Sequence, residues 1–408
     1  MLAERLSADP ACRVTVIEAG PGPGDTAVRA LTANGLQLPV GAASPVARRY
    51  RTLLTRDSEH PVDIVRGTTV GGSGAVNGGY FCRALPTDFA DPALPGWSWA
   101  DVVGHYRAIE TDLDFPDRHD GGPIRIRRAS EFVGSTAIFA EAARAAGFRW
   151  LPDLNAEPVG ENAPPGVGAV PSNIVDGVRS GPGAAFLEPV MNRPNLTVHT
   201  ATRTVRVRLT GTRAVGITAI GPAGTIELSA DRIVLSAGAI ESAHLLMLSG
   251  IGPADDLRAV GVAPVADLPV GRRTSDHPEL VMPTTWTVAP RRPVLEVLLV
   301  DDGLEIRPYT GGFISMVGDG AAGRPDWPHL GVALMRPRAR GRVSLVSADP
   351  AVAPRIEHRY DSEPADVAAL RRGCELAAEI VGGTTELGEP MWSTSQHLCG
   401  TAPMGTEA

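Results

Sequence analysis

The sequence predicts a mixed α/β fold, and three segments of the 408-residue chain carry this prediction. Residues 14–17 form a short β-branched run, which is typical of a buried strand in a parallel sheet. Residues 194–220 alternate apolar and polar side chains between glycines, as in an antiparallel hairpin or three-stranded meander. Residues 230–253 have the pattern of a strand, a turn of small residues and a helix. A parallel strand, an antiparallel hairpin or meander and a strand–turn–helix unit are therefore expected, as in an α/β fold.

The other expected elements follow from local patterns along the chain. Apolar residues at helical spacing predict helices, and short β-branched runs predict strands. These patterns predict helices at 1–6, 135–146 and 366–381, and strands at 294–300 and 342–348.

Composition and charge exclude several classes of protein. Hydrophobic residues make up 43% of the chain and charged residues 21%, as in folded globular proteins. A net charge of −8 argues against nucleic acid as the main partner. No run approaches the roughly 20 apolar residues of a transmembrane helix, and no basic-then-apolar leader opens the chain. We therefore expect a cytoplasmic location.

The four cysteines indicate neither a metal site nor a disulfide framework. Cys12, Cys82, Cys374 and Cys399 show no C-x-x-C pair and no zinc spacing. They are interpreted as reduced thiols, and no metal is expected.

The strand at 14–17 ends in an acid, Glu18. An acid at the end of the second strand of a Rossmann sheet holds the ribose of a bound cofactor through its hydroxyls. The glycines at 20, 22 and 24 follow this strand, so they favour a plain loop over the glycine fingerprint that precedes such an acid by about 20 residues.

Residues 66–79, RGTTVGGSGAVNGG, form a second glycine-rich segment. Such a loop lets the backbone approach a flat ring or a phosphate, because no Cβ stands in the way. Ser73 and Asn77 could hydrogen-bond such a ligand. From these residues alone, a ligand-binding loop and an ordinary loop are both open.

A second possible site of close approach lies at residues 230–253. The expected strand is 233–235, the helix is 240–248, and Ala237, Gly238 and Ala239 form the turn between them. A strand that leads through small residues into a helix N-terminus allows a ligand to come close to the backbone.

Four separated segments together resemble one known family. They are RGTTVGGSGAVNGG (66–79), SAGAIESAHLLMLSGIGP (236–253), DLPVGRRTSDHP (267–278) and HLCGTAPMG (397–405). In this order they resemble the signature segments of the glucose–methanol–choline (GMC) oxidoreductases, which are FAD-dependent enzymes that act on alcohols.

The resemblance implies a fold and a division of the chain. It implies a Rossmann-type FAD-binding domain with an inserted antiparallel-sheet substrate domain. The FAD-binding parts are expected at 1–85, 175–280 and 390–408, and the substrate-binding parts at 86–174 and 281–389. The substrate is expected to be a small-molecule alcohol, and specificity to lie in the inserted domain.

The resemblance also implies roles for particular residues. His397 matches the histidine that takes the hydroxyl proton, and histidine suits a base because its pKa lies near neutrality. Glu18 would bind the adenosine ribose, and Val205 marks the position where backbone atoms hold adenine. The residues that would line the flavin and pyrophosphate or form the close turn are Gly71, Gly72, Ser73, Asn77, Ala237, Gly238 and Ala239.

Two other histidines are interpreted as structural. His277 follows Asp276, and an Asp–His pair can also orient a catalytic group. Within the resembled family this histidine is not the proton acceptor, so a structural role is favoured. His244 lies among apolar residues of the expected helix 240–248 and is interpreted as a core residue.

Within the family, the segment GGSGAVNGGYFCR (71–83) resembles the oxidoreductase of the mycofactocin redox-cofactor system. This resemblance implies a dehydrogenase that reoxidises a reduced peptide-derived cofactor and passes electrons toward the respiratory chain. It also implies a location peripheral to the inner face of the membrane. Two alternatives stay open: a non-catalytic remnant of the fold, and a flavin-containing lyase.

Compared with the family pattern, the sequence lacks two segments. The G-x-G-x-x-G turn that precedes Glu18 is missing, and so is the strand after 397–405 that carries the second catalytic residue, His or Asn. We therefore expect a truncated chain, incomplete at both the N- and C-termini, that binds FAD weakly and is inactive as it stands.

Overall fold

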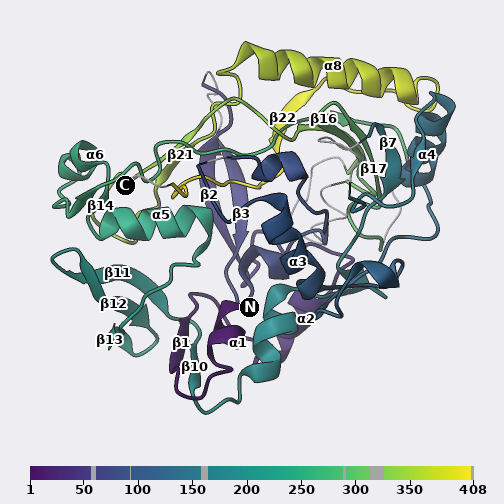
Figure 1. Ribbon diagram of the computed structural model, residues 1–408. Coiled ribbons are helices and arrows are strands. Elements are labelled where there is room, and N and C mark those ends of the chain that lie inside the picture. Colours follow the sequence, from purple (N-terminus) through teal and green to yellow (C-terminus); the bar gives the residue numbers. More distant parts are fainter. Residues whose placement is uncertain (57–60, 92, 158–163, 288–290, 313–325, 406–408) are drawn as a thin grey trace.

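The structure, a computed structural model, describes residues 1–56, 61–91, 93–157, 164–287, 291–312 and 326–405. The expected domain ranges also include the remaining residues, which lie outside the described part of the chain. The described chain has a mixed α/β fold with several separate sheets, as the sequence predicts (Figure 1).

The largest sheet has seven strands in the spatial order β22-β16-β19-β18-β17-β7-β6. Neighbouring strands are antiparallel, except for the parallel pair β6–β7 at one edge. The strands are β6 (Trp150–Leu151), β7 (Gly166–Ala169), β16 (Pro278–Pro283), β17 (Val297–Asp301), β18 (Leu304–Pro308), β19 (His329–Leu334) and β22 (Met391–Thr394).

Two helices cover one face of this sheet. They are α4 (Ser135–Ala145) and α8 (Pro364–Val381), and α8 runs along the top of the molecule in Figure 1. Both helices were predicted from their apolar spacing. Alternate strand residues such as Val332 and Ile306 pack with Leu370 of α8 in one apolar core, and all three are fully buried. This face is therefore a hydrophobic layer, which leaves the opposite face for polar side chains.

A second core lies between a four-stranded sheet and helix α5 (Gly238–Leu248). The sheet has the order β20-β21-β2-β3, with β2 (Ala47–Leu53), β3 (Val62–Gly67), β20 (Arg342–Ser344) and β21 (Arg355–Glu357). Tyr50 of β2 and Met247 of α5 belong to the shared cluster, and so does Leu398, the neighbour of His397. The segment that carries His397 is thus anchored in this core.

The expected parallel strand is present but is less buried than predicted. Strand β1 (Val14–Ile17) pairs in parallel with β10 (Leu196–His199), with Val14 opposite Leu196. Thr15 is exposed and the other three β1 residues are half-buried. The prediction of a buried strand was wrong because, among the described residues, β1 has a strand neighbour on one edge only.

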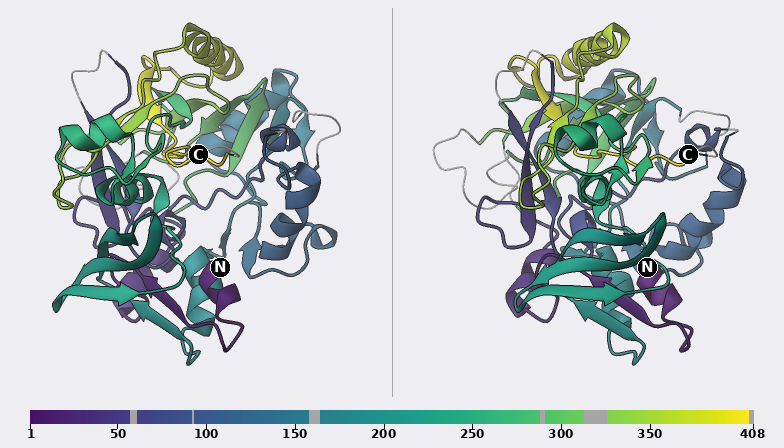
Figure 2. Two further views of the ribbon diagram at one scale, coloured as in Figure 1. Left: turned by 60° about the vertical axis from the view of Figure 1, so that its left-hand side comes forward. Right: turned by 90° about the vertical axis from the view of Figure 1, so that its left-hand side faces the viewer.

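The predicted meander is present as β11 (Arg203–Thr210), β12 (Arg213–Gly221) and β13 (Gly224–Ser229). Figure 2 shows it at the same end of the molecule as β1 and β10. The predicted strand at 233–235 is absent, and Val234 there is 59% exposed. A β-branched run forms a strand only beside a hydrogen-bonding neighbour, and no described strand pairs with this segment.

The remaining elements are short or peripheral. The helices are α1 (Leu2–Leu6), α2 (Thr26–Ala33), η1 (Gly72–Ala75), η2 (Pro86–Phe89), α3 (Trp99–Ile109), η3 (Pro116–Arg118), η4 (Gly183–Leu187), η5 (Glu188–Val190) and α6 (Ala254–Ala259). The strand pairs are β4 (Glu110–Asp112) with β5 (Ile124–Ile126), β8 (Ile174–Val175) with β9 (Val178–Arg179), and β14 (Ile251–Gly252) with β15 (Ala266–Asp267). No helix in the described part of the chain is long and apolar enough to cross a membrane.

Candidate active site

Two histidines that lie 120 residues apart in sequence meet at one end of the seven-stranded sheet. His277 directly precedes β16, and His397 follows β22, the antiparallel neighbour of β16. An isolated bridge between Ser275 and Cys399 continues this pairing past the histidines. The two Nδ1 atoms lie 3.1 Å apart, and the rings are nearly perpendicular at 88°. The predicted base therefore has a second imidazole as its direct neighbour.

Asp276 fixes the backbone of both histidines. One of its carboxylate oxygens, Oδ1, accepts hydrogen bonds from the backbone N–H groups of His277 and His397, each at 2.7 Å. The other oxygen accepts from the Thr394 hydroxyl at 3.0 Å, and Tyr360 donates to Thr394 at 2.9 Å. Burial raises the pKa of Asp276, while these hydrogen bonds oppose the rise. Asp276 is 3% exposed, so it acts as an internal anchor.

The surroundings lower the pKa of both imidazoles. Desolvation lowers the pKa of His397 to about 4, and the nearby His277 and Arg307 push it in the same direction. Desolvation and Arg307 also lower the pKa of His277. Two neutral imidazoles can share one N–H···N hydrogen bond, in which one Nδ1 donates and the other accepts. In such a pair each imidazole keeps one nitrogen lone pair, so a ring nitrogen is available to accept a proton.

The face of the sheet opposite α4 and α8 carries buried charges. Successive strand side chains point to opposite faces, so Glu279 of β16 and Glu305 and Arg307 of β18 share this face. Arg307 donates to Oε2 of Glu305 through Nε at 2.9 Å and through Nη2 at 2.6 Å. Burial alone would raise the pKa of Glu305, but Arg307 and the Tyr80 hydroxyl hold it below its ordinary value.

A glycine makes room for this charged layer. Gly331 of β19 lies opposite Arg307 of β18, and a Cβ there would stand 2.2 Å from the Oε1 atom of Glu279. Tyr309 donates to that same oxygen at 2.7 Å. Burial raises the pKa of Glu279. The absence of a side chain at Gly331 thus allows a carboxylate and a phenol to meet beside the histidine pair.

Glu18 lies where the sequence placed it, at the carboxyl end of β1. Its Oε1 atom accepts a hydrogen bond from the backbone N–H of Gly20 at 2.8 Å. Burial raises the pKa of Glu18, and the hydrogen bonds from Gly20 and Ala19 oppose the rise. The carboxylate is held at a strand end, where a ribose could be bound.

The glycine-rich loop begins with two glycines in the left-handed region. Gly71 and Gly72 have φ of 100° and 55°, and a Cβ on Gly72 would meet no atom within 4 Å. Ser73 and Asn77 are exposed, and their side chains accept hydrogen bonds from Gly67 N and Gly79 N. The open space beside Gly72 fits a flat or phosphorylated group that approaches the backbone.

A buried arginine holds this loop from behind. Arg179 is 2% exposed and donates to carbonyl oxygens of Ala75 and Asn77 in the loop, and to those of Thr32 in α2 and Gln37 after it. Burial lowers its pKa to about 10. The loop is thus tied by its carbonyl groups, which fixes its path beside the open space.

The other predicted cofactor residues lie on β11 and at the start of α5. Val205 sits at an irregularity in β11, where the register shifts between Thr204 and Arg206, so Val205 has no partner on β12. Such a bulge leaves a residue out of the ladder and so suits recognition by backbone atoms.

The N-terminus of α5 is open and lies next to the His397 segment. Ala237 caps the helix without a side-chain hydrogen bond, and Gly238 has φ of 79° with no atom within 4 Å of a hypothetical Cβ. The carbonyl of Ala239 accepts from the Thr401 hydroxyl at 2.7 Å. Unpaired N–H groups at a helix start attract phosphate or other anions. Together with the open glycine loop, they fit a dinucleotide cofactor such as FAD.

The structure therefore joins several of the predicted residues into one neighbourhood. Thr401 ties the His397 segment to Ala239, and the side chain of Gln396 accepts from Val65 N at 2.8 Å at the entry to the glycine-rich loop. Glu18 is connected to this loop through Pro21, whose carbonyl accepts from Thr69 at 2.8 Å. Val205 lies apart, on β11 of the meander.

Sequence reasoning missed several residues beside His397. It assigned His277 to structure, although the adjacent Asp276 was a signal that this segment could orient a catalytic group. Glu305 and Arg307 carried no sequence signal beyond their alternation along one strand. Ser395, which accepts from Arg307 at 2.6 Å, carried none.

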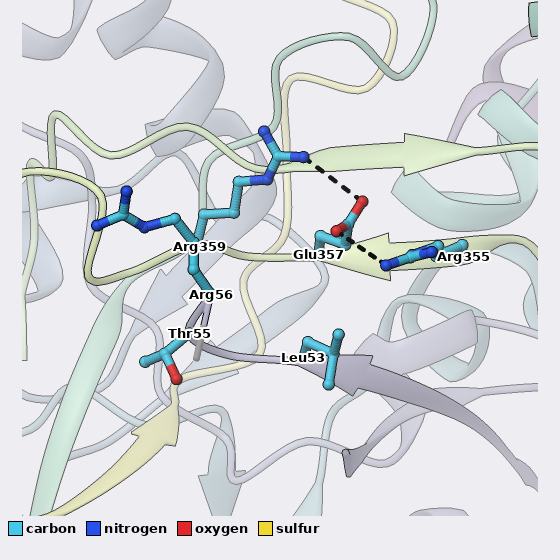
Figure 3. A pocket seen from close by; sticks show the side chains of 6 residues that line it. All are labelled: Leu53, Thr55, Arg56, Arg355, Glu357 and Arg359. Carbon is cyan, nitrogen blue, oxygen red and sulfur yellow. Dashed lines mark hydrogen bonds and ion pairs between the residues drawn. The ribbon is translucent and has the colours of Figure 1, made fainter. Parts of the chain in front are cut away.

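A surface pocket of about 220 Å³ lies away from these residues, beside β2 and β21 (Figure 3). Its arginines already have acidic partners: Arg355 and Arg359 pair with Glu357, and Arg56 pairs with Asp361. The lining residues are Leu53, Thr55, Arg56, Arg355, Glu357 and Arg359. We do not place the active site there, because no predicted site residue lines it.

Metal ligation has no support among the described residues. No group of three or more histidine, cysteine or acidic side chains in the described ranges is arranged to hold a metal ion. The four cysteines are free, without disulfides.

Comparison with known proteins identifies the class. A model of the GMC oxidoreductase family matches residues 32–279, and a second model, of the C-terminal part, matches residues 337–408. The chain belongs to the GMC oxidoreductase family. This family and structural neighbours such as formate oxidase are FAD-dependent flavoproteins.

Several relatives cover most of the chain. An uncharacterized GMC-type oxidoreductase of Rhodococcus erythropolis is 36% identical over 436 residues, which cover 100% of this chain and 85% of that protein. An oxygen-dependent choline dehydrogenase of Pseudomonas putida is 31% identical, and the match covers 93% of this chain and 74% of that protein.

Solved structures of similar fold agree with this assignment. Pyridoxine 4-oxidase from Mesorbium loti has a TM-score of 0.84 and 27% identity, and the match covers 100% of this chain and 87% of that chain. Formate oxidase from Aspergillus oryzae has a TM-score of 0.82 at 21% identity, with 99% and 86% of the two chains covered, and therefore supports the fold.

Proposed function

We propose that this chain oxidises an alcohol, a CH–OH donor, by hydride transfer to FAD, with His397 as the base. The observation that carries the proposal is the His277–His397 pair, anchored by Asp276 beside the open glycine-rich loop. Relatives named for oxidation of choline and pyridoxine support an alcohol as the substrate class.

The hydrogen bond between the histidines defines how His397 would act. If its Nε2 atom accepts the hydroxyl proton, its Nδ1 atom must already carry a hydrogen. That hydrogen points at Nδ1 of His277, 3.1 Å away, which then accepts it. His277 would thus hold His397 in the tautomer required of a base, as an orienting acid does in other catalytic pairs. When bound, FAD supplies the hydride acceptor.

The family resemblance and the positions of these residues in the structure also support a set of cofactor-binding residues. Glu18 would accept hydrogen bonds from the adenosine ribose, and the bulge at Val205 would present backbone atoms to adenine. Residues of the open loop and the α5 start would face the pyrophosphate and flavin: Gly71, Gly72, Ser73, Asn77, Ala237, Gly238 and Ala239.

The division into two domains belongs to this proposal. The FAD-binding parts are 1–85, 175–280 and 390–408, and the substrate-binding parts are 86–174 and 281–389. Strand β22, within the first set, pairs with β16, which spans the boundary at 280. The histidines would therefore act where the two domains share one sheet.

The finer version of the proposal concerns the electron donor and acceptor. The resemblance of GGSGAVNGGYFCR (71–83) to the mycofactocin-associated enzyme supports reduced mycofactocin as the substrate. In that version electrons pass to the respiratory chain from a protein peripheral to the inner face of the membrane.

The test is flavin reduction in a version of the chain that also carries the two family segments expected to be missing, saturated with FAD, with choline and pyridoxine as probes under anaerobic conditions. We expect His397→Gln to slow flavin reduction by about a hundredfold or more, the size expected of a general base. His105→Gln, an exposed histidine on α3, is the matched control and should reduce flavin at the wild-type rate. A loss of less than about threefold in H397Q would refute His397 as the base.

Flavin occupancy after gel filtration is measured first, because weak FAD binding is a separate prediction from the sequence. Tight, stoichiometric flavin on the 408-residue chain would overturn that prediction and leave the assignment of His397 open to the kinetic test.

A further inference from the structure

Arg307 is enclosed by partners in the charged layer of the seven-stranded sheet. It is 5% exposed, and its Nε and Nη2 atoms both donate to Oε2 of Glu305. Its Nη1 atom donates to the Ser395 hydroxyl at 2.6 Å and lies 3.8 Å from Glu279. Nη2 also faces the sulfur of Met335 at 3.5 Å. Since all three of its nitrogen atoms face protein partners, Arg307 is not arranged to bind a substrate group.

Ser395 connects Arg307 to both histidine segments. It lies two residues before His397, and its backbone N–H donates to the carbonyl oxygen of His277 at 3.2 Å. Its side chain accepts from Arg307. Ser395 therefore links Arg307 both to the chain between β22 and His397 and to the backbone of His277.

Several charged groups face the histidine pair from different elements. Arg66 comes from the end of β3, Asp88 from η2, and Glu305 and Arg307 from β18. Asp276 holds both histidine backbones from the segment before β16. Among these groups, the positive charge of Arg307 opposes protonation of both histidines, while Glu305 favours it.

We propose that Arg307 is a positioning residue that fixes the His397 segment through Ser395 and places a positive charge beside the histidine pair. The inference rests on the proposed function, because it gives a role to the base that the function requires. It assigns Arg307 no contact with substrate or cofactor.

The charge half of the proposal is tested by nuclear magnetic resonance on protein labelled with ¹³C at the histidine Cε1 atoms. The His397 signal is assigned with H397Q and followed from about pH 8 to about pH 2.5, so that the titration passes through the expected midpoint near 4. We expect Arg307→Gln to raise the titration midpoint of His397 by about one pH unit or more, because it leaves Glu305 unopposed. Glu305→Gln should leave the midpoint at or below the wild-type value.

If Arg307 and Glu305 formed only a structural ion pair, the two variants would not shift the His397 titration midpoint in different directions. A change of less than about 0.3 pH units in R307Q would overturn the charge half, given that a nearby charge shifts a pKa by about one unit or more. If R307Q fails to fold, the double variant E305Q/R307Q replaces both charges with amides. We expect a smaller rise there, since Arg307 outweighs Glu305 at His397, and no rise would overturn the proposal.

The positional half is tested with Ser395→Ala, which leaves the Arg307–Glu305 pair in place. The readout is the scalar coupling across the Nδ1···Nδ1 hydrogen bond in ¹⁵N-labelled protein. We expect this coupling to be lost in S395A and kept in the control Ser229→Ala, an exposed serine on β13. An unchanged coupling in S395A would overturn the positional half. Neither readout needs turnover, so failure here is distinguishable from failure of H397Q in flavin reduction.

Discussion

The two halves of the candidate site rest on very different supports. The histidine pair is at the end of a seven-stranded sheet, and the central strands β16, β18 and β19 each pair on both edges. Glu18 ends β1, which belongs to a two-stranded sheet and is half-exposed. The segment 232–236 before α5 pairs with no described strand, and Val234 there is 59% exposed.

The two supports correspond to the two proposed tasks of the site, which are proton transfer and cofactor binding. Side chains that perform proton transfer must be held within a fraction of an ångström. His277 directly precedes β16, which is paired on both edges, and the His397 segment is held by Asp276 and by Leu398 in the second core. The cofactor side depends on loop backbone around Gly72 and Gly238, where open space leaves room for a ligand. We infer that the histidine geometry is preformed, whereas the cofactor side is the less stable part of the described fold.

Hydrogen exchange should show the largest contrast. Amides of β16, β18 and β19 should exchange at least about a thousandfold more slowly than those of β1 and 232–236, because core strands open only with the global free energy of unfolding. Peptide-resolved deuterium uptake measures this contrast. Equal protection in both regions would contradict the comparison.

A valine-to-alanine substitution should reduce the free energy of unfolding by different amounts in the two regions, which is the next largest expected effect. Val332→Ala removes a fully buried side chain from the core under α8, and two lost methyl groups plus a cavity should cost about 2–3 kcal/mol. Val16→Ala in half-buried β1 should cost less than about 1 kcal/mol. Denaturant unfolding compares the two variants. Equal losses would show that β1 contributes as much as the central sheet.

Gly331 tests the packing of the charged layer. Gly331→Ala should cost about 1–3 kcal/mol, because its Cβ would displace Glu279 from Tyr309 in a buried layer. Gly104→Ala is the matched control: it lies within α3 with no atom near its Cβ, and it should stabilise the protein by about 0.5–1 kcal/mol. Thermal unfolding distinguishes them, and a neutral G331A would show that the layer can rearrange.

The pH dependence of stability at Glu241, in α5 on the cofactor side, should give the smallest effect. Burial opposes its ionisation, but His244, Tyr50 and Arg48 lower its pKa to about 2 from the ordinary 4.5. Since the folded pKa is the lower one, the stabilisation is full above pH 4.5 and is lost as the pH falls toward 2. The stability difference between wild type and Glu241→Gln should therefore shrink from about pH 7 to about pH 4.

The control for this measurement is Glu227→Gln. Glu227 is 59% exposed in its ion pair with Arg208, and the change should alter stability by less than about 0.5 kcal/mol at both pH values. A stability difference for E241Q that grows as the pH falls would contradict the lowered pKa of Glu241.

Local elements were predicted well where the chain itself contains the signal. The helix at 135–146 and the helix at 366–381 formed within two residues of the expected ranges, because apolar spacing of a helix is a local property. The prediction of a strand at 233–235 was wrong, because a strand needs a hydrogen-bonding partner from elsewhere in the fold. Burial of β1 was overestimated for the same reason.

The sequence by itself determined the family, through four motifs in order, and singled out His397, Glu18 and the glycine-rich loop at 66–79 as candidates. Motifs of this kind are local, so a single chain displays them without its fold. Only the tertiary structure decided that His277 faces His397, and that Ser395 contacts Arg307. The first pair lies 120 positions apart and the second 88, and only the pairing of β22 with β16 and the place of β18 in the same sheet bring these side chains into contact.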